Sequence, residues 1–124
     1  MTDLAHKKCV PCEGGMPPLN GETIEMYKKM LTSPWQILGD PTIKKTSEEL
    51  GAGKKLHQEF KFKDFKEAMA FVNKVADLAE EEGHHPDIYI YYNKIILDLT
   101  THAVGGLSEN DFIMAKKIEM MVTN

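Results

Sequence analysis

Hydrophobic and polar residues alternate with different periods along the chain, and the clearest alternation lies between residues 55 and 62. There, Leu56, Gln58, Phe60 and Phe62 share one face, while the residues between them are charged or polar. An alternation of two is the side-chain period of a β-strand with one buried face. The pattern therefore predicts a half-buried strand over residues 55–62.

Three longer segments place apolar residues at helical spacing, and each begins at a residue that can cap a helix. Asn20, Asp64 and Ser108 stand at the three starts, and Pro34 and Gly83 are expected to end the first two helices. The expected inner faces are Ile24, Tyr27 and Leu31; Phe65, Ala68, Met69, Val72, Val75, Ala76 and Ala79; and Phe112, Ala115, Ile118 and Val122. Each face forms one apolar stripe, so the three segments are predicted to be amphipathic helices.

Shorter apolar runs predict three further strands, over residues 35–38, 88–92 and 95–101. The last two are separated by a tight turn, which we expect at Asn93-Lys94. A polar connection with several glycines and a proline spans residues 39–53 and is expected to be a long, mobile hairpin loop.

The predicted order of elements is α-β-β-α-β-β-α. Two hairpins with intervening helices favour a two-layer α+β fold, in which the helices pack on one face of a four-stranded antiparallel sheet. Residues 1–19 are rich in proline and glycine and predict an irregular N-terminal arm, which leaves residues 20–124 as a single domain. The open face and edges of such a sheet need cover, so we expect a homo-oligomer, either a homodimer or a homotetramer.

The composition is that of an ordinary globular domain and argues against several classes of function. The chain has 124 residues, of which 42% are hydrophobic and 27% charged, and a formal net charge of −4 with neutral histidines. It lacks the positive charge that direct nucleic-acid binding normally requires, and no apolar run approaches the ~20 residues of a membrane span. The first residues lack the apolar stretch of a signal peptide, so we expect a cytoplasmic protein with reduced thiols.

Three of the five histidines lie close together in the sequence. His84 and His85 follow the expected helix end at Gly83, and His102 ends the hairpin that begins just after them. Because a hairpin returns the chain towards its start, the three rings are expected to converge. Histidine titrates near neutral pH, so such a cluster suits an acid and a base working in one site. The alternative is a pair of solvated loop histidines that cap the helix.

A metal site is the second interpretation of these residues. The His84-His85-Pro86 run lacks the helical spacing of the zinc motif HExxH, and no pattern selects carboxylate ligands, so we expect no catalytic metal. Cys9 and Cys12 form a CxxC with His6 nearby, but there is no second CxxC to complete a structural zinc site. We expect a reduced or flexible segment there, and a zinc ion shared between subunits stays the alternative.

One set of spaced residues resembles a family signature. An acidic residue, Glu80, is followed after three positions by His84-His85-Pro86, then by the aromatic Tyr92, then by His102 and Asp111. This pattern is similar to the signature of the pterin-4a-carbinolamine dehydratases, which are also known as the dimerisation cofactor of a homeodomain transcription factor. The similarity extends over roughly residues 20–122. The family's α-β-β-α-β-β-α fold agrees with the order predicted above.

The resemblance implies a dehydratase-like domain over residues 20–124. Its reaction would eliminate water from 4a-hydroxytetrahydropterin to give quinonoid dihydropterin, which recycles the cofactor of aromatic amino-acid hydroxylases. The pterin is then the substrate, and no separate cofactor is expected. The site residues implied are the catalytic His84, His85 and His102, and the substrate-binding or orienting Glu80, Pro86, Tyr92 and Asp111.

Individual roles can be suggested for some of these residues. His84 and His102 would be the proton-transfer pair, and His85 would orient the pterin and share the role of base. Glu80 would orient His84. Asp111 would hydrogen-bond the pterin or a histidine, although its spacing from Ser108 also fits a capping box at the start of the last helix.

The chain departs from the family pattern in its cysteine-containing N-terminal arm and in the long connection at residues 39–53. Two other classes of function stay open beside the dehydratase. One is a protein-interaction or dimerisation module, and the other is a metal-binding protein or metal-dependent hydrolase.

Overall fold

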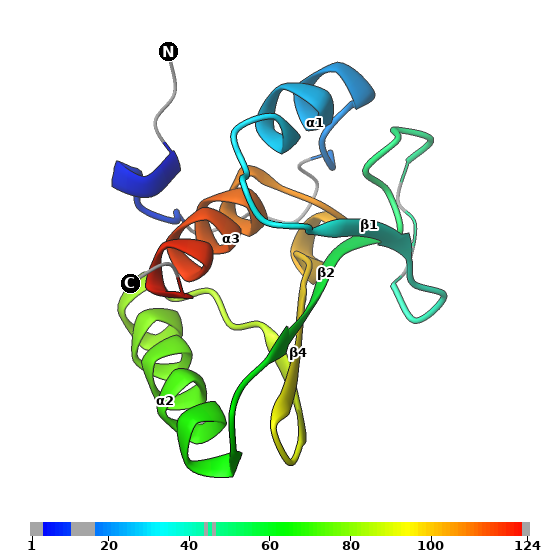
Figure 1. Ribbon diagram of the computed structural model, residues 1–124. Helices are drawn as coiled ribbons and strands as arrows, with labels where there is room; N and C mark the ends of the chain where they lie inside the picture. Colours follow the sequence, from blue (N-terminus) through cyan, green and yellow to red (C-terminus); the bar gives the residue numbers. More distant parts are fainter. Residues whose placement is uncertain (1–3, 11–16, 44, 46, 123–124) are drawn as a thin grey trace.

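The computed structural model describes residues 4–10, 17–43, 45 and 47–122, and it folds into one sheet with helices beside it (Figure 1). The helices are α1 (Gly21–Lys28), α2 (Phe65–Glu82) and α3 (Glu109–Val122); the strands are β1 (Gln36–Gly39), β2 (Lys54–Lys61), β3 (Asp87–Tyr91) and β4 (Lys94–Leu99); and two 3-10 turns are η1 (Leu4–His6) and η2 (His102–Val104).

The sheet has the strand order β1-β2-β4-β3, and every neighbouring pair is antiparallel. Gln58 lies opposite Leu97, which lies opposite Ile88, so these residues share the face that α2 and α3 cover. The predicted α+β class with a four-stranded antiparallel sheet is confirmed.

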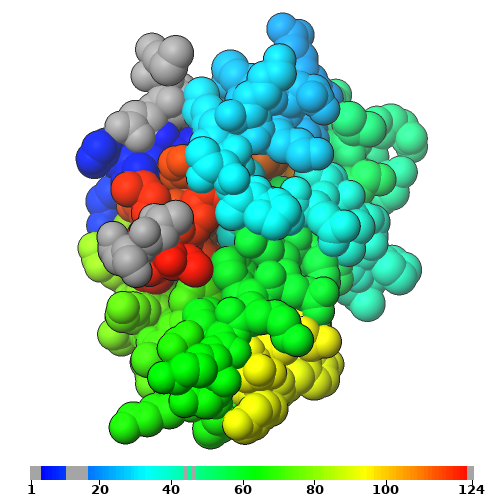
Figure 2. Space-filling model, in the orientation of Figure 1, coloured from blue at the N-terminus to red at the C-terminus, as the bar shows by residue number. Residues whose placement is uncertain are grey.

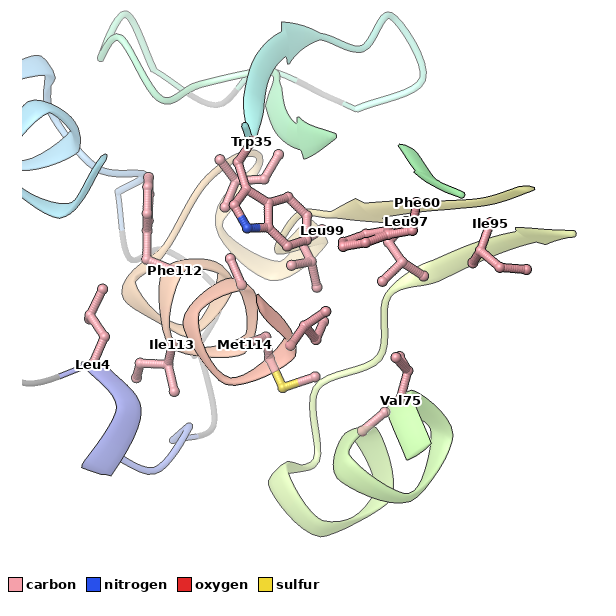
Figure 3. Close-up of a cluster of buried hydrophobic side chains, with 14 of the residues drawn as sticks. Leu4, Trp35, Phe60, Val75, Ile95, Leu97, Leu99, Phe112, Ile113 and Met114 are labelled. Carbon is pink, nitrogen blue, oxygen red and sulfur yellow. The ribbon is translucent and has the colours of Figure 1, made fainter. Parts of the chain in front are cut away.

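The core lies between this face of the sheet and the helices (Figure 3). The Trp35 ring meets the Phe60 ring edge-on at 5.9 Å between centroids, and Phe60 lies 4.9 Å from Phe71 of α2. On the other side of α3, Tyr27 of α1 packs 5.5 Å from Phe112. Aromatic contacts therefore join the sheet to α2, and α1 to α3.

Local signals account for most helix ends. The Asn20 side chain accepts a hydrogen bond from the Thr23 N–H, and the Asp64 side chain does the same for Glu67. Gly83 takes the left-handed conformation, with φ 67°, and ends α2 as predicted.

The first helix ends earlier than predicted, at Lys28 rather than near Pro34. The reason is a contact from a distant part of the chain. The buried carboxylate of Glu119 in α3 accepts hydrogen bonds from the backbone N–H groups of Thr32 and Ser33. Those two groups point to α3, so the segment leaves the helical path.

Further details of the prediction are wrong, and they include Ala76 and Val122, which are exposed rather than on the inner faces of their helices. Tyr91 pairs with Lys94, so the β3–β4 turn is Tyr92-Asn93, one residue before the predicted position, and Tyr92 has a positive φ of 54°. On α2, Phe65 is 48% exposed instead of facing the core. Its ring stacks on Tyr92, and the hairpin lies against the beginning of α2 in Figure 2.

The end of the β1–β2 connection is fixed to the segment that enters α3. Gly51 donates its N–H to the Leu19 carbonyl and accepts from the Leu107 N–H. A Cβ at Gly106 would stand 2.1 Å from the Gly51 carbonyl oxygen, so only glycine fits there. This close backbone approach fixes the segment just before Glu109, where α3 begins.

The first described residues are not detached from the domain. Leu4 is 2% exposed and belongs to the core, beside α3. Cys12 lies outside the described residues, and the boundary expected at residues 19 and 20 stays a prediction. Within the described ranges, no helix is long and apolar enough to cross a membrane.

Candidate active site

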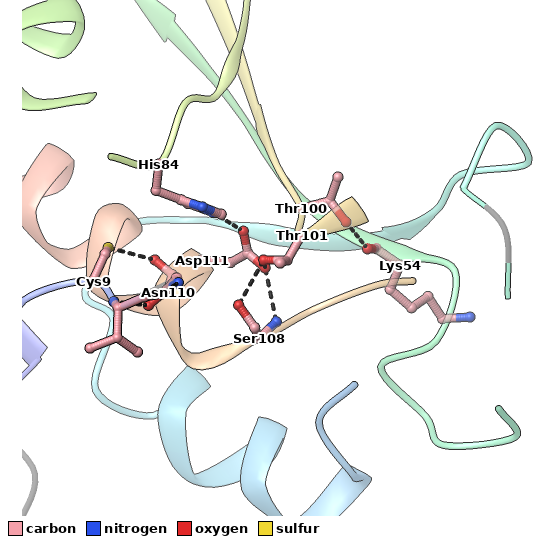
Figure 4. Close-up of polar contacts among 9 residues, drawn as sticks. Cys9, Lys54, His84, Thr100, Thr101, Ser108, Asn110 and Asp111 are labelled. Atoms are coloured by element: carbon pink, nitrogen blue, oxygen red, sulfur yellow. Dashed lines mark hydrogen bonds and ion pairs between the residues drawn. The ribbon is translucent and has the colours of Figure 1, made fainter. Parts of the chain in front are cut away.

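His84 is held against the start of α3 by a buried carboxylate (Figure 4). Its Nε2 lies 2.7 Å from Oδ1 of Asp111, whose side chain is completely buried, while the His84 side chain is 11% exposed. The end of α2 orients the His84 ring towards α3. After Gly83 turns the chain, the His84 N–H donates a hydrogen bond back to the Ala79 carbonyl.

The other oxygen of Asp111 is held by two donors. Oδ2 accepts from the Thr101 hydroxyl at 2.9 Å and from the Ser108 N–H at 2.9 Å. The Thr101 and Ser108 hydroxyls are themselves 2.7 Å apart. Asp111 therefore contacts a histidine and also caps α3, so both sequence interpretations of this residue describe real contacts.

This geometry fixes which ring nitrogen of His84 is available for chemistry. A carboxylate can only accept a hydrogen bond, so Nε2 carries the proton that points to Asp111. Nδ1 is then the ring nitrogen that Asp111 does not engage. In a hydrolase triad a carboxylate likewise orients a histidine, through the other ring nitrogen, and stabilises the ring when it becomes positively charged.

His85 points in another direction. Its Nε2 lies 2.5 Å from the carboxylate of Glu80, and both side chains are well exposed, at 60% and 79%. Glu80 was expected to orient His84, and that expectation is wrong. The reversal of the chain at Gly83 sends His84 towards α3 and turns His85 back along α2.

His102 begins η2 with an exposed side chain and directly follows Thr101, whose hydroxyl contacts Asp111. The structure thus brings the backbone of His102 next to the His84–Asp111 pair. Convergence of its ring with those of His84 and His85 stays a prediction.

The remaining two site candidates occupy different places. Pro86 is buried directly after the histidine pair. Tyr92 is 65% exposed and stacks on Phe65, the first residue of α2. His84 follows the other end of that helix, which has 18 residues and therefore spans about 27 Å. The structure does not bring Tyr92 to the histidines of its own chain.

Thr101 is the site residue that sequence reasoning missed. A threonine at a strand end carries no signal by itself, since its partner lies ten residues further on. The only available hint was its position directly before His102.

A third histidine–carboxylate pair lies on the open face of the sheet. His57 Nδ1 is 2.6 Å from one oxygen of Asp98, and Lys55 Nζ is 3.0 Å from the other. Burial works to lower the pKa of Lys55, but Asp98 and Asp40 outweigh it and raise that pKa. Lys55 also lies 3.4 Å from Asp40, so this cluster is an internally paired network that ties β2 to β4 and to the loop after β1.

Metal binding gains no support from the part of the chain that the structure describes. Among those residues, no three histidine, cysteine or carboxylate side chains come together as metal ligands. Burial, with help from Glu82, raises the pKa of Cys9 to about 12, so its thiol stays protonated and is a poor ligand. A zinc ion shared through Cys12 concerns a residue outside the described ranges.

Fold and site together define a class of protein. The two-layer α+β domain holds a histidine whose ring is oriented by a buried carboxylate, and oriented histidines of this kind are common in sites of acid–base chemistry. A protein-family model described as pterin 4 alpha carbinolamine dehydratase matches residues 17–121. The chain belongs to this family, which confirms the resemblance and the expected enzyme class, a hydro-lyase.

Related proteins extend the match to nearly the whole chain. A relative from Nitrosomonas eutropha is 47% identical over 120 residues, covering 97% of this chain and 94% of its own. One from Alkaliphilus metalliredigens is 41% identical over 119 residues, covering 96% of each. Both are named as pterin-4-alpha-carbinolamine dehydratases. The crystal structure of a transcriptional coactivator/pterin dehydratase from Brucella melitensis matches with a TM-score of 0.67 at 28% identity, covering 84% of this chain and 97% of that one.

Proposed function

We propose that the protein dehydrates 4a-hydroxytetrahydropterin by histidine acid–base catalysis and so recycles the pterin used by aromatic amino-acid hydroxylases. In this reaction the C4a–O bond and the N5–H bond break, a C4a=N5 double bond forms, and water leaves. No electrons are exchanged with another molecule, so the pterin is the substrate and no further cofactor is required. The observation that carries the proposal is the buried His84–Asp111 pair in a chain of this family.

His84 is assigned the role of base. Its Nε2 is engaged by Asp111, so Nδ1 takes the N5 proton and the buried carboxylate stabilises the positive ring that results. The leaving hydroxyl needs a proton as well, and His102 supplies it in this proposal. His85, exposed at the helix end, contacts the pterin from outside and orients it.

We also propose a homo-oligomer, a homodimer or homotetramer, acting in the cytoplasm without direct nucleic-acid contacts. Support for self-association comes from β3, an edge strand whose Tyr89, Ile90 and Tyr91 are 42%, 43% and 56% exposed. A long apolar edge is normally covered in a stable protein. The formal charge of −4 argues against binding to a polyanion. The cytoplasmic location stays a prediction from the sequence.

The test is a stopped-flow assay of carbinolamine dehydration with wild type, His84→Ala, His102→Ala and His57→Ala. The last variant is a matched control, because His57 is also a histidine paired with a buried aspartate. We expect His84→Ala to reduce kcat by about 10²–10³-fold, which is within the range of general acid–base catalysis. His102→Ala should reduce kcat by about 10–100-fold, just below that range. The His57 variant should stay close to wild type.

Two outcomes would contradict this assignment at different levels. A wild-type protein that does not exceed the spontaneous dehydration rate refutes the function. A folded His84→Ala variant with the full rate refutes only the role of that histidine.

A further inference from the structure

The segment at residues 4–10, called here the docked segment, lies before residue 17, where the match to the family model begins. It contains the start of the cysteine-bearing arm that departs from the family signature. Its Leu4 side chain is 2% exposed and packs in the core beside α3. The docked segment therefore lies outside the residues that the family model matches, yet its Leu4 side chain is part of the core.

One contact of the docked segment fixes the end of α2. The Cys9 N–H donates to Oε1 of Glu82 at 2.9 Å, and Lys117 of α3 donates to Oε2 at 2.7 Å. Burial works to raise the pKa of Glu82, but the hydrogen bonds from Lys117 and Cys9 outweigh it and lower that pKa. Glu82 is the last residue of α2 and stands two residues before His84.

A second set of contacts fixes the start of α3. The Val10 N–H donates to Oδ1 of Asn110 at 3.1 Å, and Nδ2 of Asn110 donates to the Val10 carbonyl at 2.6 Å. Lys7 pairs with Glu109 at 2.7 Å. Figure 4 shows Cys9 and Asn110 beside the pair formed by His84 and Asp111.

These contacts lie next to the two residues whose relative position matters most. His84 and Asp111 come from different helix ends, 27 residues apart in the chain, so their 2.7 Å contact depends on how these two ends are held against each other. We propose that the docked segment positions the active site, by holding the end of α2 through Glu82 and the start of α3 through Asn110. The proposal rests on the function proposed above, because it assigns a purpose to the alignment of that site.

The experiment uses the full chain with three substitutions. Leu4→Asp should undock the segment, because an unpaired charge is strongly disfavoured in the core. Val10→Pro removes the N–H that bonds Asn110, at a residue whose side chain is 60% exposed. Val10→Ala keeps this N–H and is the matched control. Hydrogen exchange of residues 4–10 reports docking, and the ¹⁵N resonances of the His84 ring report its bond to Asp111.

We expect Leu4→Asp to lower kcat by about tenfold and Val10→Pro by a smaller factor, since small misplacements of reacting groups reduce rates strongly. KM should change by less than the fall in kcat. The His84 ring resonances should move in both variants and stay in place in Val10→Ala. A segment that only stabilised the fold would lower the unfolding temperature without moving these resonances.

The proposal is overturned if residues 4–10 of a variant exchange rapidly while the His84 ring resonances and kcat stay at their wild-type values. If Leu4→Asp fails to fold, Val10→Pro still decides the question, because its side chain does not enter the core. If the wild type lacks dehydratase activity, the ring resonances still test positioning, so failure of the proposed function is distinguishable from failure of this inference.

Discussion

His84 and His85 are adjacent in the chain, and Nε2 of each ring contacts a carboxylate, yet one pair is buried and the other is exposed. The His84–Asp111 pair is almost entirely buried and continues into the hydroxyl of Thr101. The His85–Glu80 pair stands in solvent, and Glu80 is 79% exposed. Gly83 ends α2 in the left-handed conformation directly before both residues, so neither of them continues the helix.

The difference shows that the energy contributed by a histidine–carboxylate contact depends on where the contact lies. An exposed ion pair contributes about 0–1 kcal/mol, because water screens it and both side chains remain free to move. A buried carboxylate with several donors is fixed in place and fixes the ring that it contacts. Burial and partners therefore make His84, rather than its neighbour, the better candidate for proton transfer.

The largest effect is expected from Asp111→Asn, which tests the buried pair directly. An amide is almost the same size as the carboxylate, but it can present an N–H to His84 and so favour the wrong ring tautomer. We expect kcat to fall by about 10²–10⁴-fold, as for other oriented catalytic histidines. Stopped-flow dehydration measures this, and a loss below about threefold would show that Asp111 only caps α3.

Glu119→Gln is the control for Asp111→Asn, because Glu119 is also a buried carboxylate but its partners among the described residues include no histidine. Glu119 holds the Thr32 and Ser33 N–H groups and pairs with Lys116. We expect a loss of about 1–3 kcal/mol in the free energy of unfolding at neutral pH, with kcat unchanged. Thermal and urea unfolding measure the loss, and a large fall in kcat would mean that any buried carboxylate in this fold affects the site.

The pH dependence of the Glu119 effect follows from its pKa. Burial works to raise this pKa, but the hydrogen bonds from Thr32 and Ser33 outweigh it, so the folded-state pKa lies below the ordinary value of 4.5. The stabilisation is therefore complete above that value and is lost as the pH falls through the folded-state pKa. The stability difference between wild type and Glu119→Gln should shrink on acidification.

Thr101→Val should have a smaller effect, because it removes one of the donors that hold Asp111. Valine keeps the shape of threonine, so the change is mainly the lost hydroxyl at Oδ2 of Asp111. We expect kcat to fall several-fold and stability to fall by about 1–2 kcal/mol. Thr101→Ser keeps the hydroxyl and should retain most of the wild-type kcat and stability. If Thr101→Ser loses as much as Thr101→Val, the effect comes from packing and not from the hydroxyl.

Local sequence signals predicted the fold well, since most of them act within a few residues. Asp64 and Gly83 mark both ends of α2 because a cap and a left-handed stop are local interactions. The alternation in β2 likewise gave its buried face, with Leu56, Gln58 and Phe60 inside. The end of α1 was missed because Glu119, which draws that segment away, lies in the last helix.

The site was only partly predictable, because sequence spacing does not give distance. Glu80 and His84 have helical spacing, but one left-handed residue gives Glu80 a different partner. Tyr92 belongs to the signature, yet α2 and the hairpin place it at the far end of the helix, on Phe65. Signature spacing therefore identified the family correctly and the contacts within the site only in part.

The smallest effects are expected at the exposed pair, in His85→Ala, Glu80→Ala and the double variant. We expect kcat to change by less than about threefold in each, with KM rising in His85→Ala if this ring orients the pterin. The coupling energy between the two side chains should be below about 0.5 kcal/mol in a double-mutant cycle on kcat, because both are in solvent. A fall in kcat for His85→Ala as large as that for Asp111→Asn would reverse the comparison. Proton transfer would then belong to the exposed ring, and the buried pair would serve to hold α2 against α3.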